Sequence, residues 1–229
     1  MKKIFTVLAA VMLLFALASC GSANTSSDQE SASSASAETS LPPESGDAQS
    51  SKGGSGNILI AYFSRAGENY KVGVIEKGNT QLIAEMIAEQ TGGDLFHIET
   101  VNPYPEDYRE CTNVAQQELR EQARPELSDA VDHFEDYDVV FLGYPNWWGD
   151  MPMAVYTFME RYDFSGKTIV PFATHEGSGL SSTESSIAST CSGAKVLDGL
   201  AVRGSVAQNS QEEAKEAVVN WLRDAGFVD

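Results

Sequence analysis

Residues 57–80 read NILIAYFSRAGENYKVGVIEKGNT, an apolar run followed by a polar loop and the start of a helix. The run from Ile58 to Phe63 is continuous, which is typical of a strand buried on both faces of a parallel sheet. The loop opens at Ser64 and closes at Gly78-Asn79-Thr80, where a helix can be capped. Because free N–H groups and the helix dipole attract anions there, we expect either a phosphate cradle or an ordinary strand-to-helix turn.

The alternation of strand and helix continues along the chain. Apolar runs predict further strands over residues 94–98, 138–143, 168–173 and 196–202. Periodic apolar positions predict helices that start near residues 80, 106, 152, 181 and 210, the last with a capping box at Ser210-Gln211-Glu212-Glu213. This order predicts a doubly wound parallel α/β sheet with helices on both faces.

Three loops of unusual composition follow predicted strands, at residues 64–80, 144–152 and 174–179. Ligands of such sheets bind beyond the carboxyl ends of the strands, where these loops meet. In the middle loop, Trp147 or Trp148 can stack on a fused ring system, and the glycines of the last loop let backbone amides approach a ring edge. The three loops together predict a site for a flat ligand with a phosphate tail.

The N-terminus resembles the leader of a bacterial lipoprotein. Residues 1–19 combine Lys2 and Lys3 with a short apolar run, as in a signal peptide, and small residues precede Cys20. We therefore expect lipidation of Cys20 and a membrane anchor that places the folded domain on the extracytoplasmic side. The alternative is a conventional signal peptide cleaved after Ala16-Leu17-Ala18.

Residues 20–56 are predicted to be a disordered tether after the lipidated cysteine. Twelve serines and no aromatic residue occur in positions 21–56, so this segment cannot bury enough apolar surface to fold. The folded domain is then residues 57–229. The whole chain carries a net charge of −18, which argues against a nucleic-acid partner and favours a basic partner.

Cysteine and histidine spacing indicates no metal site. The chain has three cysteines and three histidines, without a C-x-x-C pair. Cys111 and Cys191 are expected to be buried or idle thiols, and export would permit a disulfide between them as the alternative. No nucleophile–base constellation is visible, so no catalytic residue is assigned.

Several motifs resemble the flavodoxin-like proteins, and among them the bacterial flavodoxin-family lipoproteins. They are residues 143–152 (GYPNWWGDMP), 155–158 (VYTF), 165–172 (SGKTIVPF) and 174–179 (THEGSG). The resemblance covers essentially all of residues 57–229. It implies a flavodoxin fold with a five-stranded sheet of order 2-1-3-4-5 and bound FMN.

The resemblance also implies which residues bind FMN. The phosphate loop of the family corresponds to Ser64, Arg65, Ala66, Gly67, Asn79 and Thr80. Its first ring-flanking loop corresponds to Pro145, Asn146, Trp147, Trp148 and Gly149, and its second to Thr174, His175, Glu176, Gly177, Ser178 and Gly179.

The chain departs from the family pattern at two places. Ala66 replaces a threonine of the phosphate loop, and residues 68–78 interrupt it; Asn69 and Tyr70 in this insertion either cover the cofactor or are plain surface. His175 and Glu176 stand where small residues are expected. Arg65 either binds the phosphate or pairs with a nearby acid.

These observations predict an electron-transfer flavoprotein that exchanges electrons with a basic redox partner. The alternatives are an FMN-dependent NAD(P)H:quinone-type oxidoreductase acting on a small quinone-like acceptor, and a non-redox ligand-binding module that keeps the fold. Oligomeric state is not predicted.

Overall fold

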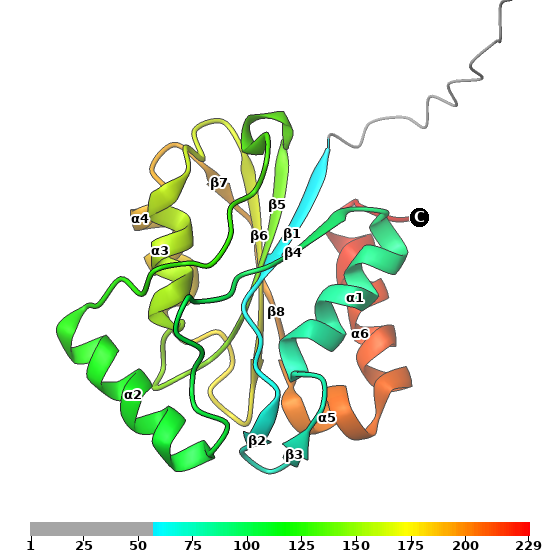
Figure 1. The fold of residues 1–229 in the computed structure, drawn as a ribbon. Helices are drawn as coiled ribbons and strands as arrows, with labels where there is room; N and C mark the ends of the chain where they lie inside the picture. The colour runs from blue at the N-terminus through cyan, green and yellow to red at the C-terminus, as the bar shows by residue number, and fades with distance from the viewer. Residues whose placement is uncertain (1–56) are drawn as a thin grey trace, which may run out of the picture. The chain divides into compact units, whose positions relative to one another are not determined.

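A parallel sheet forms the centre of residues 57–229, the part of the chain that the computed structural model describes (Figure 1). The predicted signal peptide, Cys20 and the tether lie outside the described residues. The strand order is β4 (Asp94–His97), β1 (Ile58–Tyr62), β5 (Val139–Pro145) and β6 (Thr168–His175), with all neighbours parallel. Together with the last strand, this confirms the predicted fold and the order 2-1-3-4-5.

The last strand is split in two, although the sequence predicts one strand over residues 196–202. Both β7 (Lys195–Val196) and β8 (Leu200–Arg203) pair in parallel with β6. The break lies opposite Pro171, whose carbonyl oxygen would be 2.9 Å from a Cβ placed on Gly199. Because proline has no N–H to donate to the neighbouring strand, a continuous last strand would gain less hydrogen-bond energy at this point.

Helices cover both faces of the sheet, and β1 contributes alternately to the two cores. Leu59 and Ala61 belong to the core beneath α3 (Met153–Arg161) and α4 (Thr183–Thr190). Ile58 and Ile60 belong to the opposite core, beneath α1 (Asn79–Thr91) and α6 (Gln211–Asp224). Full burial of one such aliphatic side chain is worth about 1.5–3 kcal/mol, which explains the continuous apolar run.

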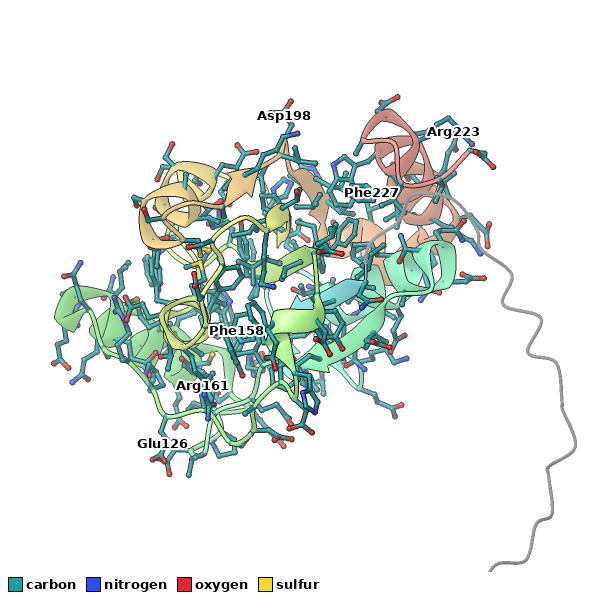
Figure 2. All side chains as sticks on the ribbon, turned by 90° about the horizontal axis from the view of Figure 1, so that it is seen from above. Glu126, Phe158, Arg161, Asp198, Arg223 and Phe227 are labelled. Atoms are coloured by element: carbon teal, nitrogen blue, oxygen red, sulfur yellow. The ribbon has the colours of Figure 1, made fainter. Side chains whose placement is uncertain are left out.

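Figure 2 shows side chains filling the space between the sheet and its helices. Phe158 of α3 is completely buried in this layer, whereas the charged Glu126, Asp198 and Arg223 lie at the outer edge. The remaining long helix, α2 (Tyr108–Glu121), lies on the same side of the sheet as α3 (Figure 1).

Three elements are present that the sequence does not predict. A β-hairpin of β2 (Gly67–Asn69) and β3 (Gly73–Ile75) occupies the insertion in the first loop. A six-residue helix, α5 (Gly204–Asn209), precedes α6, and a 3-10 helix, η1 (Phe134–Asp136), precedes β5. Each is too short to give a clear periodic pattern.

The predicted capping box at Ser210 is wrong. Ser210 is the N-cap of α6, but its side chain accepts no capping hydrogen bond. The reason is its position directly after α5, where its N–H donates to the carbonyl oxygen of Val206 at 2.9 Å and its carbonyl accepts from Ala214 at 3.1 Å. The residue is therefore held by backbone bonds of two consecutive helices.

Cys111 and Cys191 are both free and buried, which confirms buried thiols and excludes the disulfide in this structure. Burial raises the pKa of both thiols, that of Cys191 to about 12. Within residues 57–229, no cluster of three or more His, Cys, Asp or Glu side chains has the arrangement of a metal site. None of the helices in this range has the length and apolarity needed to span a bilayer.

Candidate functional site

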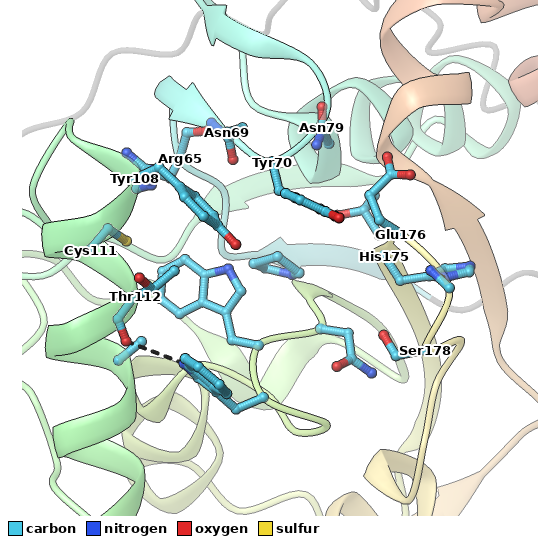
Figure 3. Close-up of a pocket in the computed structure, with 17 residues that line it drawn as sticks. Arg65, Asn69, Tyr70, Asn79, Tyr108, Cys111, Thr112, His175, Glu176 and Ser178 are labelled. Atoms are coloured by element: carbon cyan, nitrogen blue, oxygen red, sulfur yellow. Dashed lines mark hydrogen bonds between the residues drawn. The ribbon is translucent and has the colours of Figure 1, made fainter.

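A pocket of about 380 Å³ lies at the carboxyl edge of the sheet (Figure 3). It is enclosed by the β2–β3 hairpin, the start of α1, one face of α2 and the loops after β5 and β6. The lining residues are Arg65, Asn69, Tyr70, Asn79, Tyr108, Cys111, Thr112, Ala115, Pro145, Asn146, Trp147, Trp148, Thr174, His175, Glu176, Gly177 and Ser178. Its size is within the usual range for small-molecule sites.

The first loop is folded tightly against the start of α1. The Ser64 hydroxyl accepts a hydrogen bond from the backbone N–H of Gln81 at 3.0 Å, so this serine caps the helix from outside it. A Cβ on Gly78 would lie 2.2 Å from Ser64 Oγ and 2.8 Å from the backbone nitrogen of Arg65. Only glycine fits there, because any side chain would push the loop away from the helix.

Among residues 57–229, Arg65 donates only to backbone carbonyl groups. Its Nη1 lies 2.8 Å from the oxygen of Pro105 and 3.0 Å from that of Glu106, and its Nη2 bonds to the carbonyl of Glu68. No carboxylate forms an ion pair with it among the described residues. Its Nε is buried without a partner there. The alternative of pairing with an acid is therefore wrong, and the guanidinium adds a positive charge to a pocket that the Glu176 carboxylate also lines.

The tryptophan loop is a tight turn after β5. Trp148 and Gly149 have φ values of 57° and 83°, and Trp147 pairs with Asp150 across the turn. Two consecutive positive φ values are characteristic of a type I′ turn, which glycine tolerates easily and tryptophan does not. Asn146 ties this loop to the third one, since its Nδ2 donates to the carbonyl of Gly179 at 2.9 Å.

The two indoles have different surroundings. Trp147 is partly buried and makes edge-to-face contacts with Phe63 and Tyr104, with ring centroids 5.4 and 5.2 Å away. Trp148 is 56% exposed, and its Nε1 donates to the carbonyl of Thr112 on α2 at 3.2 Å. Both therefore remain available as walls of the pocket.

The third loop is fixed by its own polar contacts. Thr174 is buried and shares a hydrogen bond of 2.8 Å with the hydroxyl of Thr80. Glu176 accepts from the backbone N–H of Ser205 at 2.6 Å, which connects the loop to the start of α5. These contacts hold the loop in place without using the backbone amide of Ser178.

His175 is held as a neutral hydrogen-bond donor. Its Nδ1 accepts from the backbone N–H of Gly177 at 2.8 Å, which leaves the proton of the neutral ring on Nε2. Burial and the nearby Arg203 guanidinium lower the pKa of His175, while Glu176 opposes them less strongly. The imidazole is therefore mostly uncharged at neutral pH.

The structure brings eleven of the seventeen predicted cofactor-binding residues to this pocket. They are Arg65, Asn79, Pro145, Asn146, Trp147, Trp148, Thr174, His175, Glu176, Gly177 and Ser178. Ser64, Ala66 and Gly67 instead line a neighbouring hollow of about 290 Å³. Thr80, Gly149 and Gly179 line neither, although each bonds to or adjoins a lining residue.

Sequence reasoning missed the contribution of α2. Tyr108, Cys111, Thr112 and Ala115 line the pocket and follow the i, i+3, i+4, i+7 spacing of one helix face. This spacing predicts a face that packs against something, but does not say that the neighbour is a ligand pocket. Asn69 and Tyr70, left open between cofactor cover and plain surface, both line the pocket.

A parallel five-stranded α/β fold with an aromatic pocket at its carboxyl edge defines a flavodoxin-like protein. The chain belongs to the flavodoxin family, since the model of that family, described as flavodoxin, matches residues 57–223.

Solved structures agree with the family. A candidate flavoprotein from Bacteroides eggerthii DSM 20697 is 29% identical, with 74% of this chain and 97% of the other covered and a TM-score of 0.60. One from Bacteroides uniformis ATCC 8492 is 26% identical, covering 74% and 99% with a TM-score of 0.58. A flavoprotein in complex with FMN from Lactobacillus acidophilus NCFM is 20% identical, covering 71% and 99% with a TM-score of 0.51. No curated protein matches significantly.

Proposed function

We propose that the chain binds FMN and transfers electrons, as an anchored protein outside the cytoplasmic membrane. The observation that carries this proposal is that aromatic side chains and a helix N-terminus meet at one pocket with the Arg65 guanidinium, which forms no ion pair with a carboxylate among residues 57–229. A planar aromatic ring with an anionic tail is the kind of ligand that matches these three features. The Lactobacillus acidophilus relative, which shares the fold, is described in complex with FMN.

The phosphate end fits Arg65 and Asn79. The first N–H groups of α1 have no acceptor within the helix, and that of Gln81 is already bound by Ser64. Asn79 and Arg65 line the pocket beside this helix end, and Arg65 Nε is buried without a partner among the described residues. A phosphate beside the guanidinium would form charge-assisted contacts with it and would neutralise its charge.

The ring end fits the other two loops. Trp147 and Trp148 offer aromatic surface, while the backbone of Gly177 and Ser178 and the Nε2–H of His175 offer polar contacts to a ring edge. When bound, FMN supplies the redox chemistry by accepting and releasing electrons. The contribution of the chain is to bind the ring, to orient it and to limit its contact with water.

An electron carrier is the first candidate, because residues 57–229 hold 28 acids and 12 bases and carry a net charge of −16. Such a surface attracts basic redox partners. An NAD(P)H:quinone-type reductase is the second candidate. It is favoured by the exposed aromatic side chains of Tyr70 and Trp148 at the pocket, which leave apolar surface for a small planar acceptor.

Steady-state kinetics of the FMN-loaded chain divide these candidates. We expect little NAD(P)H oxidation with or without a quinone, and rapid reoxidation of the chemically reduced protein by a basic haem protein. Quinone-dependent NAD(P)H oxidation at enzymatic turnover rates would instead establish the reductase.

The anchored location rests on the sequence around Cys20. We expect the mature chain to begin at a lipidated Cys20 and to fractionate with membranes, because several acyl chains give firm anchoring. Replacement Cys20→Ser should release the chain from the membrane fraction. A wild-type chain found only in the soluble fraction would contradict the anchor without affecting the FMN proposal.

A further inference from the structure

The hairpin inserted into the first loop presents an aromatic side chain to the pocket. Tyr70 follows β2 at the tip of this hairpin, lines the pocket and is 55% exposed. Because this ring lines the pocket and is not fully covered by other side chains, an aromatic face is available for stacking on a ligand. Figure 3 shows Tyr70 extending across the pocket toward Glu176.

The base of the hairpin is firmly attached to the segment before α2. The backbone N–H of Glu68 donates to the carbonyl of Glu106 at 2.9 Å, and the Glu68 carboxylate accepts from the N–H of Tyr108 at 3.1 Å. Arg65 adds its bonds to the carbonyl groups of Pro105 and Glu106. The position of Tyr70 is thus set by the hydrogen bonds that hold the hairpin, in spite of its exposure.

A second aromatic ring supports Tyr70. The rings of Tyr70 and Tyr108 are stacked, with centroids 6.0 Å apart and an angle of 22° between their planes. Tyr108 begins α2 and also lines the pocket. This contact limits the orientations of Tyr70 before any ligand arrives, which lowers the entropy cost of using it in binding.

The hairpin also supplies what the third loop lacks. Residues 174–179 contribute an imidazole but no phenyl, phenol or indole ring to the pocket, whereas the tryptophan loop contributes two indoles. We propose that Tyr70 is a ring-stacking residue for the flavin, so that the inserted hairpin, and not the third loop, provides the second aromatic wall. This inference rests on the proposed FMN binding.

Flavin titrations of the full chain test the inference. Tyr70→Ala should weaken the binding of both FMN and riboflavin about tenfold, because stacking acts on the ring that the two ligands share. Tyr70→Phe should stay within about twofold of wild type, since it keeps the ring. Dissociation constants come from quenching of flavin fluorescence, and thermal unfolding of the apo variants checks that each is folded.

Val74→Ala is the matched control within the same hairpin. Val74 is 82% exposed and does not line the pocket, so its truncation should leave both affinities unchanged. A folded Tyr70→Ala variant that binds both flavins like wild type would overturn the inference while leaving the proposed function intact. An equal loss in Val74→Ala would overturn it as well, by showing that the hairpin as a whole, not the Tyr70 ring, is responsible. Failure of the wild-type chain to bind any flavin would instead overturn the proposed function.

Discussion

Arg65 brings a positive charge to the pocket, and no carboxylate among residues 57–229 forms an ion pair with it. In a domain of net charge −16, we expect this charge to favour the binding of a phosphate against the overall field. Its three carbonyl contacts satisfy part of the guanidinium but supply no carboxylate to pair with its charge.

We predict that Arg65→Gln raises the dissociation constant of FMN by about tenfold or more relative to that of riboflavin. The reason is that a charge-assisted hydrogen bond to phosphate is worth ~1.5–3 kcal/mol. Fluorescence titration with both flavins gives the two ratios. A loss of affinity that arises from a looser hairpin affects FMN and riboflavin alike, so it cancels when the two ratios are compared. Equal weakening of FMN and riboflavin would contradict a role for Arg65 at the phosphate.

His175 should make the stability depend on pH. Its folded-state pKa lies below the ordinary value of 6.5, so between the two values the unfolded chain binds more protons. The free energy of unfolding should therefore fall as the pH drops below about 6.5. Urea unfolding across this pH range should show that the free energy of unfolding falls less steeply with decreasing pH for His175→Gln than for wild type.

A proton titration of His175 by NMR with a midpoint above 6.5 would show that the ring is charged more easily in the folded protein and would contradict the account.

At the scale of elements, two helix N-termini allow a direct comparison. Asp107 caps α2 through Oδ1, which accepts from the N–H of Glu110 at 2.8 Å. Ser210 occupies the same position at α6 without a side-chain bond. We predict that Asp107→Ala lowers the free energy of unfolding by ~1 kcal/mol, and that Ser210→Ala changes it by less than ~0.5 kcal/mol.

Urea unfolding curves of the two variants measure both values. Equal losses would mean that the Ser210 hydroxyl does cap α6 in solution, as its sequence pattern indicates. The comparison also explains why a capping motif alone is insufficient: the preceding helix α5 already engages the backbone of Ser210.

Long elements could be predicted because burial determines their sequences. The run Val139-Val140-Phe141-Leu142 lies in β5 between two helix layers, so every position must be apolar. The hairpin and α5 could not be predicted in the same way, since they depend on contacts distant in sequence. A Cβ on Gly204 in α5, for example, would lie 2.3 Å from Asn79 Nδ2, a relation between positions 125 residues apart.

The site was predictable where loops follow strands. Trp147 and His175 could be placed at one edge because parallel strands deliver their loops there. Tyr108 and Cys111 could not be placed, because the crossing of α2 beside the pocket is set by packing. The position of Tyr70 could not be predicted either, because it depends on how the hairpin turns back over the pocket, and the presence of an insertion does not indicate this.

At the scale of the whole molecule, charge should control the reaction with partners. We predict that electron transfer to a basic haem protein slows several-fold as salt rises from low to physiological concentration, because screening within ~8–10 Å weakens the attraction. Stopped-flow rates measure this effect. Transfer to an uncharged small acceptor is the control and should change little; a similar salt response for both would contradict steering by the acidic domain.

Absorbance spectroscopy of the purified chain provides a direct test of FMN binding. After addition of FMN and removal of the unbound excess, we expect flavin absorbance bands at one FMN per chain, with the fluorescence of the flavin quenched by the surrounding aromatic residues. A folded chain that retains no flavin and leaves the spectrum of added FMN unchanged would contradict it.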